Sequence, residues 1–312
     1  MTTSTTISVD EILQLIDVQK PYFALEELVY HSDGLLTALI PIQQIPDCEP
    51  LPISNSEAGR HLAVLGSCVC ALSLSTRQRY YYLASGANAT RDTLDSRKTD
   101  YLIGSARCMR IDQKTAQAEI FLHYPDGTLL SKTTINYHLL HPSIFERIYK
   151  NRAQLTPEIT QNPYTKVPSF VPAMVSSKQM LTSVSSIKVS DCAGHFPGLP
   201  IIPVSVLFGM AIRLAIHLLQ TMVKNPQAVF CVKECTSEAK NPASPGEKID
   251  FEAELIYADT ENSYVVRISA FTNCNCCVGV ADLVLCEVIP VAQDKQESEE
   301  NADIVALPFS QG

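Results

Sequence analysis

Two stretches of the chain, residues 57–74 and 204–220, are apolar or small on nearly every side, which is typical of helices buried inside a protein. Asn55 or Ser56 can cap the first helix, and Pro203 suits the start of the second. The segments between them are rich in β-forming residues and are separated by turn signals. The predicted strands are two runs within 22–42, then 79–85, 101–111, 115–124, 129–140, 182–189, 229–234, 248–258, 263–273 and 277–289.

The predicted elements occur twice in the same order: a strand, a long buried helix and an antiparallel meander. An antiparallel sheet wrapped around one apolar helix is the hotdog arrangement, so we expect an α+β protein with two hotdogs in one chain, a double hotdog. The expected parts are a first hotdog domain at 1–150, a linker with four prolines at 151–178, a second hotdog domain at 179–290 and a flexible acidic tail at 291–312.

Composition narrows the classes of function. The 312 residues are 46% hydrophobic and 18% charged, which is typical of a folded globular chain. A net charge of −9 without a long basic run argues against nucleic acid as a partner. The N-terminus lacks the basic start of a signal peptide, so we expect a cytoplasmic protein with reduced thiols. The most apolar stretch, 199–219, contains two prolines and an arginine, which argues against a membrane span.

Metal or cofactor chemistry has little support in the sequence. Cys274, Cys276 and Cys277 lie close together, but zinc prefers wider ligand spacing and usually a second pair of ligands. Ser67 follows a glycine but falls within a predicted helix, whereas a nucleophile elbow needs a strand, a turn and a helix. We therefore expect neither a metal nor a cofactor.

The segment 191–203, Asp-Cys-Ala-Gly-His-Phe-Pro-Gly-Leu-Pro-Ile-Ile-Pro, is a tight proline-rich loop ahead of the second predicted helix. It resembles the active-site loop of the hotdog β-hydroxyacyl-(acyl carrier protein) dehydratases, whose pattern is HFPGxPxxPGxLxxEAxAQ. Six fixed residues of that pattern are present: His195, Phe196, Pro197, Gly198, Pro200 and Pro203. The resemblance extends over 182–289 and includes a weaker match at 242–247 to the family's PVxPGD turn.

Two positions of the second hotdog depart from the pattern. Val204 stands where the family has glycine, and Gly209, fourteen residues after His195, stands where it has the catalytic carboxylate. The first helix begins with Glu57 in Glu-Ala-Gly-Arg-His, which resembles the family's Glu-Ala segment, and Gln43 takes the place of the histidine fourteen residues earlier. Because the family forms its site between two hotdogs, the resemblance implies one composite site of His195 and Glu57.

The resemblance also implies the role of each residue. His195, neutral near pH 7, would take the α-proton, and Glu57, its pKa raised by burial, would protonate the leaving hydroxyl. The oxyanion and orienting group would consist of Val204, Ile201 and Gly198. Within it, the Val204 N–H would hold the thioester oxygen and the Ile201 carbonyl would orient the imidazole. The acyl tunnel would be lined by Phe196, Val206, Phe208 and Leu62.

Each candidate also has a plainer interpretation. His195 could be structural within its proline-rich turn. Glu57 could only complement the dipole at the start of its helix. His61, one turn from Glu57, could be a further site residue, but a packed polar residue is the simpler alternative.

The main functional hypothesis is a dehydratase that removes water from a β-hydroxyacyl thioester in fatty acid or polyketide biosynthesis, with double-bond isomerisation left open. Its partner would be an acyl carrier protein with a phosphopantetheine-linked substrate, or acyl-coenzyme A in its place, and the chain could pair as a homodimer. One alternative is a hotdog acyl thioesterase in which Glu57 activates water. The other is a non-catalytic acyl-binding or scaffold protein.

Overall fold

The computed structural model describes residues 3–44, 48–94, 96–150, 161–259 and 262–288. The first half contains β1 (Ser4–Thr6), α1 (Val9–Ile16), β2 (Glu26–His31), β3 (Leu35–Pro41), α2 (Asn55–Ser73), β4 (Tyr81–Arg91), β5 (Tyr101–Ile111), β6 (Thr115–His123), β7 (Leu129–Leu140) and α3 (Pro142–Tyr149). The second half contains η2 (Pro163–Thr165), β8 (Ala173–Ser176), β9 (Gln179–Val184), η3 (Val189–Cys192), α4 (Val204–Met222), β10 (Val229–Ala239), β11 (Ile249–Ala258), β12 (Ser263–Thr272) and β13 (Cys277–Val288).

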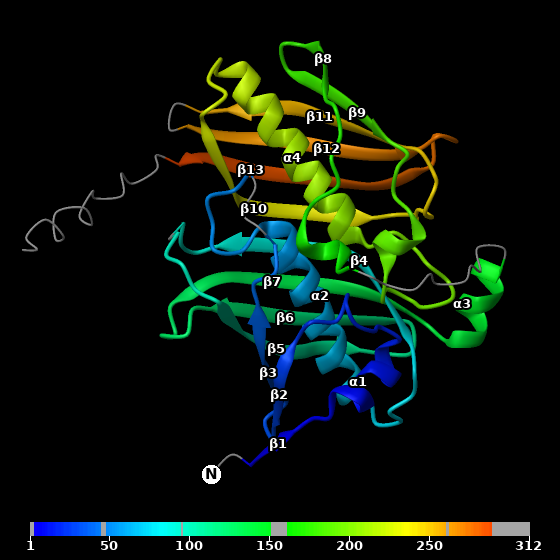
Figure 1. Ribbon diagram of the computed structural model, residues 1–312. Coiled ribbons are helices and arrows are strands. Elements are labelled where there is room, and N and C mark those ends of the chain that lie inside the picture. The colour runs from blue at the N-terminus through cyan, green and yellow to red at the C-terminus, as the bar shows by residue number, and fades with distance from the viewer. Residues whose placement is uncertain (1–2, 45–47, 95, 151–160, 260–261, 289–312) are drawn as a thin grey trace, which may run out of the picture.

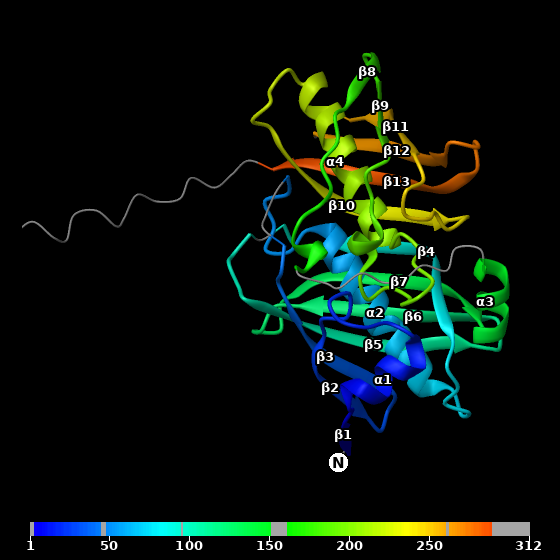
Figure 2. The same cartoon turned by 45° about the vertical axis from the view of Figure 1, so that its right-hand side comes forward.

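The strands of the described residues form one antiparallel sheet of 13 strands, in the order β1-β2-β3-β5-β6-β7-β4-β10-β13-β12-β11-β9-β8 (Figure 1). Apart from β1, which has no counterpart, the order is symmetric about the pair β4–β10, so each half of the chain contributes one hotdog sheet. Helices α2 and α4 contact each other and lie across the same face of the sheet (Figure 2). The chain is therefore an α+β double hotdog, as the repeated order of elements predicts.

The pair β4–β10 is the seam between the two hotdogs, and the sequence prediction missed most of it. Residues 86–90 pair with 234–238, whereas the predicted strands ended at Ser85 and Glu234. The missed part of β4 is mainly glycine, alanine and asparagine, which favour strands only weakly. Hydrogen bonding across the seam keeps these residues extended.

Each long helix belongs to the core of its own half, α2 to the first and α4 to the second. The first begins at Asn55 because the Ser54 hydroxyl accepts the N–H of Glu57 at 3.1 Å, which caps the helix. Among the described helices, α4 alone is long and apolar enough to cross a membrane by length and composition. It packs against the sheet as a core helix.

Gly209 lies where α2 and α4 approach each other. A Cβ atom at this position would come within 3.0 Å of the Ser56 Cβ and 3.0 Å of the Val167 Cγ2. The helices could not pack this closely around a larger side chain. This approach accounts for glycine at the position where the dehydratase pattern has its carboxylate.

The range predicted as a linker, 151–178, contains η2 and β8, and β8 pairs with β9 at an edge of the sheet. Residues 151–160 lie outside the described residues, as does the predicted tail at 291–312. Helix α3 follows β7 directly and was not predicted from the sequence.

The segment after α1 folds back over the loop that carries His195. Val18 forms an antiparallel bridge with His195, and the N–H of Gln19 donates to the carbonyl of Gly194 at 2.7 Å. Gly194 has a φ of +78°, and a Cβ atom there would overlap the carbonyl oxygen of Gln19. Glycine alone meets both requirements, so this residue joins the N-terminal segment to the loop.

We expect Gly194→Ala to destabilise the protein by about 2 kcal/mol more than Gly198→Ala, measured as the free energy of unfolding in urea. Both glycines have positive φ, so alanine costs about 1 kcal/mol of backbone strain at either position. Only at Gly194 does the added methyl meet another backbone, since nothing lies within 4 Å of a Cβ at Gly198. Equal losses for the two variants would contradict the close approach of Gln19.

Candidate functional site

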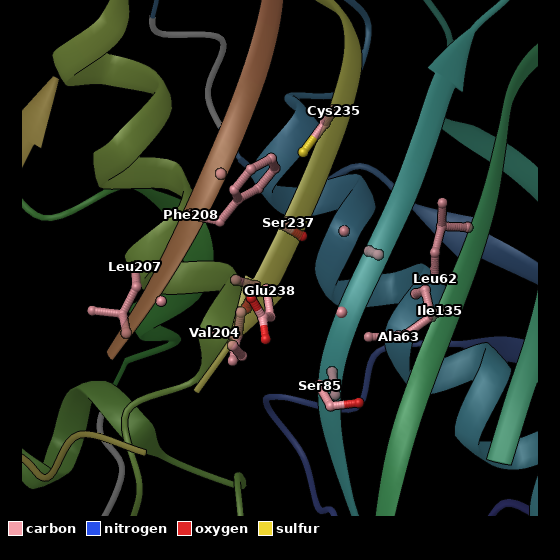
Figure 3. A pocket seen from close by; sticks show the side chains of 18 of the residues that line it. Leu62, Ala63, Ser85, Ile135, Val204, Leu207, Phe208, Cys235, Ser237 and Glu238 are labelled. Carbon is pink, nitrogen blue, oxygen red and sulfur yellow. The ribbon is translucent and has the colours of Figure 1, made fainter. Parts of the chain in front are cut away.

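A cavity of about 280 Å³ lies at the seam, between the sheet and helices α2 and α4. Figure 3 shows side chains of α2, α4, β4 and β10 around it. Strands β4, β10 and β13 contribute small residues to its wall, namely Ala87, Ala89, Ser237, Ala239, Gly279 and Ala281. These short side chains leave space that the helices do not fill. A long, mostly apolar space of this kind suits an acyl chain.

His195 lines one end of the cavity. Its neighbours Gly194 and Phe196 both have positive φ, so the loop is tightly wound around it. The Phe196 ring is anchored between Tyr81 and Phe145, with centroids 5.1 and 5.4 Å away. Burial of this ring offsets the strain of its left-handed backbone and thereby fixes the direction of His195.

The imidazole of His195 is oriented by the backbone. Its Nδ1 lies 3.0 Å from the carbonyl oxygen of Ile201. Because a carbonyl can only accept, Nδ1 carries the hydrogen of the neutral ring and Nε2 keeps a lone pair. Burial lowers the pKa of His195 to about 4, and the hydrogen bond to Ile201 opposes part of this shift. At neutral pH His195 is therefore an uncharged base.

Tyr22 and Ser205 accompany His195 at this end of the cavity, and sequence reasoning found neither. The centroids of the Tyr22 ring and the imidazole are 4.7 Å apart, and the Tyr22 hydroxyl lies 3.4 Å from Ser205 Oγ. Burial raises the pKa of Tyr22, which keeps its hydroxyl protonated at neutral pH. No motif marks Tyr22, because only the folding of the N-terminal segment over the loop brings it to His195.

Most of the other residues predicted for the oxyanion and orienting group and for the acyl tunnel line the cavity: Val204, Ile201, Phe196, Phe208 and Leu62. Val204 is the first residue of α4 and is 44% exposed. Gly198 and Val206 are not among the lining residues. Gly198 is exposed on the loop, and Val206 packs against both cores.

Glu57, the acid of the composite site expected from the sequence, is also not among the lining residues. The residue is 1% exposed, and its carboxylate accepts the N–H of Gln43 at 2.6 Å and that of Gln44 at 3.1 Å. The guanidinium of Arg60 lies 3.8 Å away. The carboxylate thus ties the segment before α2 to the helix.

The rotation of α2 explains this placement. The cavity face of the helix includes Asn55, Ala58 and Leu62, which follow one another at about one-turn intervals. Glu57 is two residues from Asn55, or about 200° around a helix with 3.6 residues per turn, and so projects away from these three residues. Val64 lies on nearly the same side of α2 as Glu57, two turns further on, and does line the cavity. The Glu57 carboxylate is turned instead toward the N–H groups of Gln43 and Gln44. The Glu-Ala match at the helix start could not reveal this rotation.

His61 shares the Glu57 side of α2 and is buried there. Its Nε2 lies 3.1 Å from Arg60 Nη2 and 3.6 Å from Glu57 Oε1. Burial lowers the pKa of His61 to about 4, aided by the nearby Arg60 charge and opposed by Glu57. His61 is therefore part of a packed polar cluster outside the cavity lining.

Two tyrosine rings connect this cluster with His195. The Arg60 guanidinium lies 4.9 Å from the ring centroid of Tyr164, and the Tyr164 ring lies 5.1 Å from that of Tyr22. Tyr22 in turn packs against the imidazole. The structure therefore does not bring His195 and Glu57 together on one cavity wall.

Two carboxylates do line the cavity, Glu234 and Glu238. Glu238 lies near Val204 in Figure 3, but it is exposed and pairs with Lys240 at 3.4 Å. An exposed carboxylate in an ion pair is a poor replacement for the buried proton donor that the dehydratase pattern implies. Among the described residues, no group of three or more His, Cys, Asp or Glu side chains is placed to hold a metal ion.

Comparisons with known proteins bear on the fold. No family model and no curated protein matches the chain. A conserved protein with hot dog fold from Alicyclobacillus acidocaldarius is similar at 9% identity and a TM-score of 0.51, over 91% of this chain and 100% of that one. The chain has the hotdog fold.

Structures of two named enzymes are similar to the same degree. An acyl-CoA thioesterase II, TesB2, from Mycobacterium marinum is 10% identical with a TM-score of 0.52, over 91% of this chain and 99% of that one. An acyl-ACP thioesterase from Bacteroides thetaiotaomicron is 13% identical with a TM-score of 0.51, over 81% and 98%. At these identities the likeness shows the fold alone.

The state of the imidazole can be measured by nuclear magnetic resonance of ¹⁵N-histidine-labelled protein, with the His195 signal assigned from a His195→Gln sample. We expect a neutral ring protonated on Nδ1 that does not titrate between pH 7 and about 5, because burial disfavours the charged form. Protonation on Nε2, or a midpoint near 6.5, would contradict the orientation by Ile201.

Proposed function

We propose that this protein hydrolyses acyl thioesters, with the acyl chain in the seam cavity and His195 as the base. The observation that carries the proposal is a neutral imidazole, oriented by the Ile201 carbonyl, at one end of a largely apolar cavity that Glu57 does not line. A base next to a space for an acyl chain is the minimum that water-dependent cleavage of a thioester needs.

The leaving group separates hydrolysis from dehydration. A thiol has a pKa of about 8.5, so a thiolate can leave a carbon without first taking a proton. Hydroxide is the conjugate base of water, whose pKa is about 15.7, so its departure needs a proton donor. With Glu57 engaged elsewhere, the residues around His195 suit cleavage of a carbon–sulfur bond better than loss of water.

The reaction would proceed in two steps at the His195 end of the cavity. His195 Nε2 takes a proton from water while the water oxygen bonds to the thioester carbon, and the carbonyl oxygen becomes negative. The first N–H groups of α4, at Val204 and Ser205, have no partner within their own helix and favour this charge. The carbonyl then reforms, the carbon–sulfur bond breaks, and the thiolate takes the proton back from the imidazolium.

The substrate class follows from the cavity and agrees with two of the structural neighbours. One of them is named an acyl-CoA thioesterase and another an acyl-ACP thioesterase. We infer an acyl thioester of coenzyme A or of an acyl carrier protein. The carrier stays open, because the cavity would hold the acyl chain in either case.

Dehydration of a β-hydroxyacyl thioester is the second candidate, and the loop around His195 favours it. Six fixed residues of the dehydratase pattern are present, and the contact between His195 Nδ1 and the Ile201 carbonyl is the one that the pattern implies. The proton donor would then be a residue other than Glu57. Tyr22 is the candidate, because its protonated hydroxyl lines the cavity and its ring packs on His195.

Assays on dodecanoyl-CoA and 3-hydroxydodecanoyl-CoA separate these functions. We expect release of free coenzyme A from both, with kcat/KM at least about 100-fold lower in His195→Gln because the base is lost. His123→Gln, on β6, is the matched control and should keep the wild-type rate. Glu57→Gln should lose much less activity than His195→Gln. Enoyl product without thiol release would establish the dehydratase instead, and no product from either substrate would favour a non-catalytic role.

The acyl cavity can be shortened from the sheet side. We expect Ala89→Leu to lower kcat/KM for dodecanoyl-CoA by about tenfold or more while leaving butanoyl-CoA hydrolysis unchanged, because the larger side chain would fill part of the space. Asn88→Leu adds the same side chain to the exposed face of β4 and should affect neither substrate. Equal loss for both chain lengths in Ala89→Leu would argue against an acyl chain along the seam.

A further inference from the structure

A buried arginine lies at the end of the seam away from Val204, because Thr90 pairs with Glu234 whereas Gly86 pairs with Glu238, which lies near Val204 in Figure 3. Arg91 is the last residue of β4, lines the cavity and is 6% exposed. Its Nη2 donates to Asn55 Oδ1 at 3.0 Å. Its Nε and Nη1 have no hydrogen-bond acceptor among the described residues. Two donors of this guanidinium are therefore unused at the wall of the cavity. They can bind a hydrogen-bond acceptor of a ligand.

The buried acidic side chain linked to Arg91 through Asn55 is already used by other donors. Glu49 is 5% exposed and accepts the backbone N–H of Asn55 at 2.8 Å and the Asn55 Nδ2 at 2.6 Å. It reaches Arg91 only through Asn55, and within the described ranges Arg91 forms no ion pair. Lys233 and Glu234 also line this end from β10, and both are exposed.

Burial makes the two unused donors of Arg91 costly, because the buried carboxylate of Glu49 is linked to Arg91 only through Asn55. An arginine side chain stays protonated in proteins, so it cannot lower the cost by losing a proton. A buried ionised group without a partner is strongly unfavourable, whereas a carboxylate can accept from a guanidinium at several positions. The energetics therefore favour an anionic oxygen group at Arg91.

The symmetry of the seam shows that Arg91 is specific to one end. The paired residues Asn88 and Thr236 are at the centre of the seam, between the pairs 86–238 and 90–234. Arg91 is three residues after Asn88 on β4. The equivalent position on β10, three residues after Thr236, is Ala239. Ala239 also lines the cavity and directly follows Glu238, which lies near Val204 in Figure 3. The two ends of the seam have equivalent strand pairing, but one has an arginine where the other has an alanine.

The distance between the ends matches an acyl chain of medium length. From Gly86, which pairs with Glu238 near Val204, to Arg91 is five residues of strand, or about 16 Å at 3.3 Å per residue. Small side chains border the path between them, including Ala87 and Ala89. A chain whose thioester lies at His195 would therefore place its distal end near Arg91.

We propose that Arg91 and Asn55 form a subsite for a carboxylate at the distal end of the acyl chain, so that the preferred substrates are ω-carboxyacyl thioesters. The proposal rests on the proposed function for the position of the thioester at His195. The same anionic chemistry could come from a phosphate of the carrier group. The burial of Arg91 favours the chain end, because a phosphate would reach it only if the carrier group entered the cavity from this side.

Binding of thioether analogues tests the subsite without depending on turnover. The probes are S-dodecyl-coenzyme A and S-(11-carboxyundecyl)-coenzyme A, which differ only at the distal end, with free coenzyme A as the third ligand. By titration calorimetry we expect the wild-type protein to bind the carboxyl-ended analogue at least tenfold more tightly than the methyl-ended one. Arg91→Gln should abolish this preference and leave the affinity for the methyl-ended analogue unchanged.

Arg267→Gln is the matched control, because it removes an arginine that is exposed on β12 and paired with Asp282 at 2.8 Å. It should keep the preference. Arg91→Lys retains the charge and should keep part of it. If Arg91→Gln does not fold, the comparison of the two analogues with wild-type protein still decides the matter.

Three outcomes would overturn the proposal. Equal affinity of the wild-type protein for the two analogues is the first, and an unchanged preference in folded Arg91→Gln is the second. The third is a loss in Arg91→Gln that is the same for both analogues and for free coenzyme A, which would assign Arg91 to a carrier phosphate. Failure of the proposed function looks different, since the carboxyl-ended analogue would be preferred while neither acyl nor ω-carboxyacyl thioesters were hydrolysed.

Discussion

Pairing of β4 with β10 is the interaction on which the rest of the structure depends. It joins two hotdog sheets into one, and it holds residues 86–90 in a strand although glycine, alanine and asparagine favour strands weakly. The same short side chains that make the strand hard to predict also leave the space beneath α2 and α4 unfilled. One constraint thus produces both the continuous sheet and the cavity, since larger residues at Ala87 and Ala89 would fill the interior.

The chemistry at one end of this space depends on a second backbone feature, the wound loop at 194–201. Gly194 allows Gln19 to approach, Phe196 anchors the loop in the first core, and the Ile201 carbonyl takes the hydrogen of Nδ1. His195 is left with little freedom and with its Nε2 lone pair available. Its low pKa follows from the same burial, so orientation and protonation state have one physical cause.

Sequence reasoning succeeded where local pattern decides the structure. The bounds of β5 and β7, the two buried helices and the loop of His195 follow from periodicity, turn residues and a long motif. It failed where long-range contacts decide. The end of β4 is extended because it pairs across the seam, and Tyr22 reaches His195 because the N-terminal segment folds over Gly194. Glu57 was placed on the right helix, but a short match cannot give the rotation that turns its carboxylate toward Gln43 and Gln44.

In the structure the two halves complement each other differently from what the sequence suggested. The sequence suggested that one hotdog kept a base and the other an acid for a single reaction. In the structure the difference lies along one cavity, with an uncharged imidazole near the start of α4 and a guanidinium with two unused donors near the start of α2. A symmetric pair of hotdogs would place the same residues at both ends. Fusion into one chain removes that requirement. One end of the cavity can then hold the base His195, while Arg91 at the other end can bind the distal end of the same ligand.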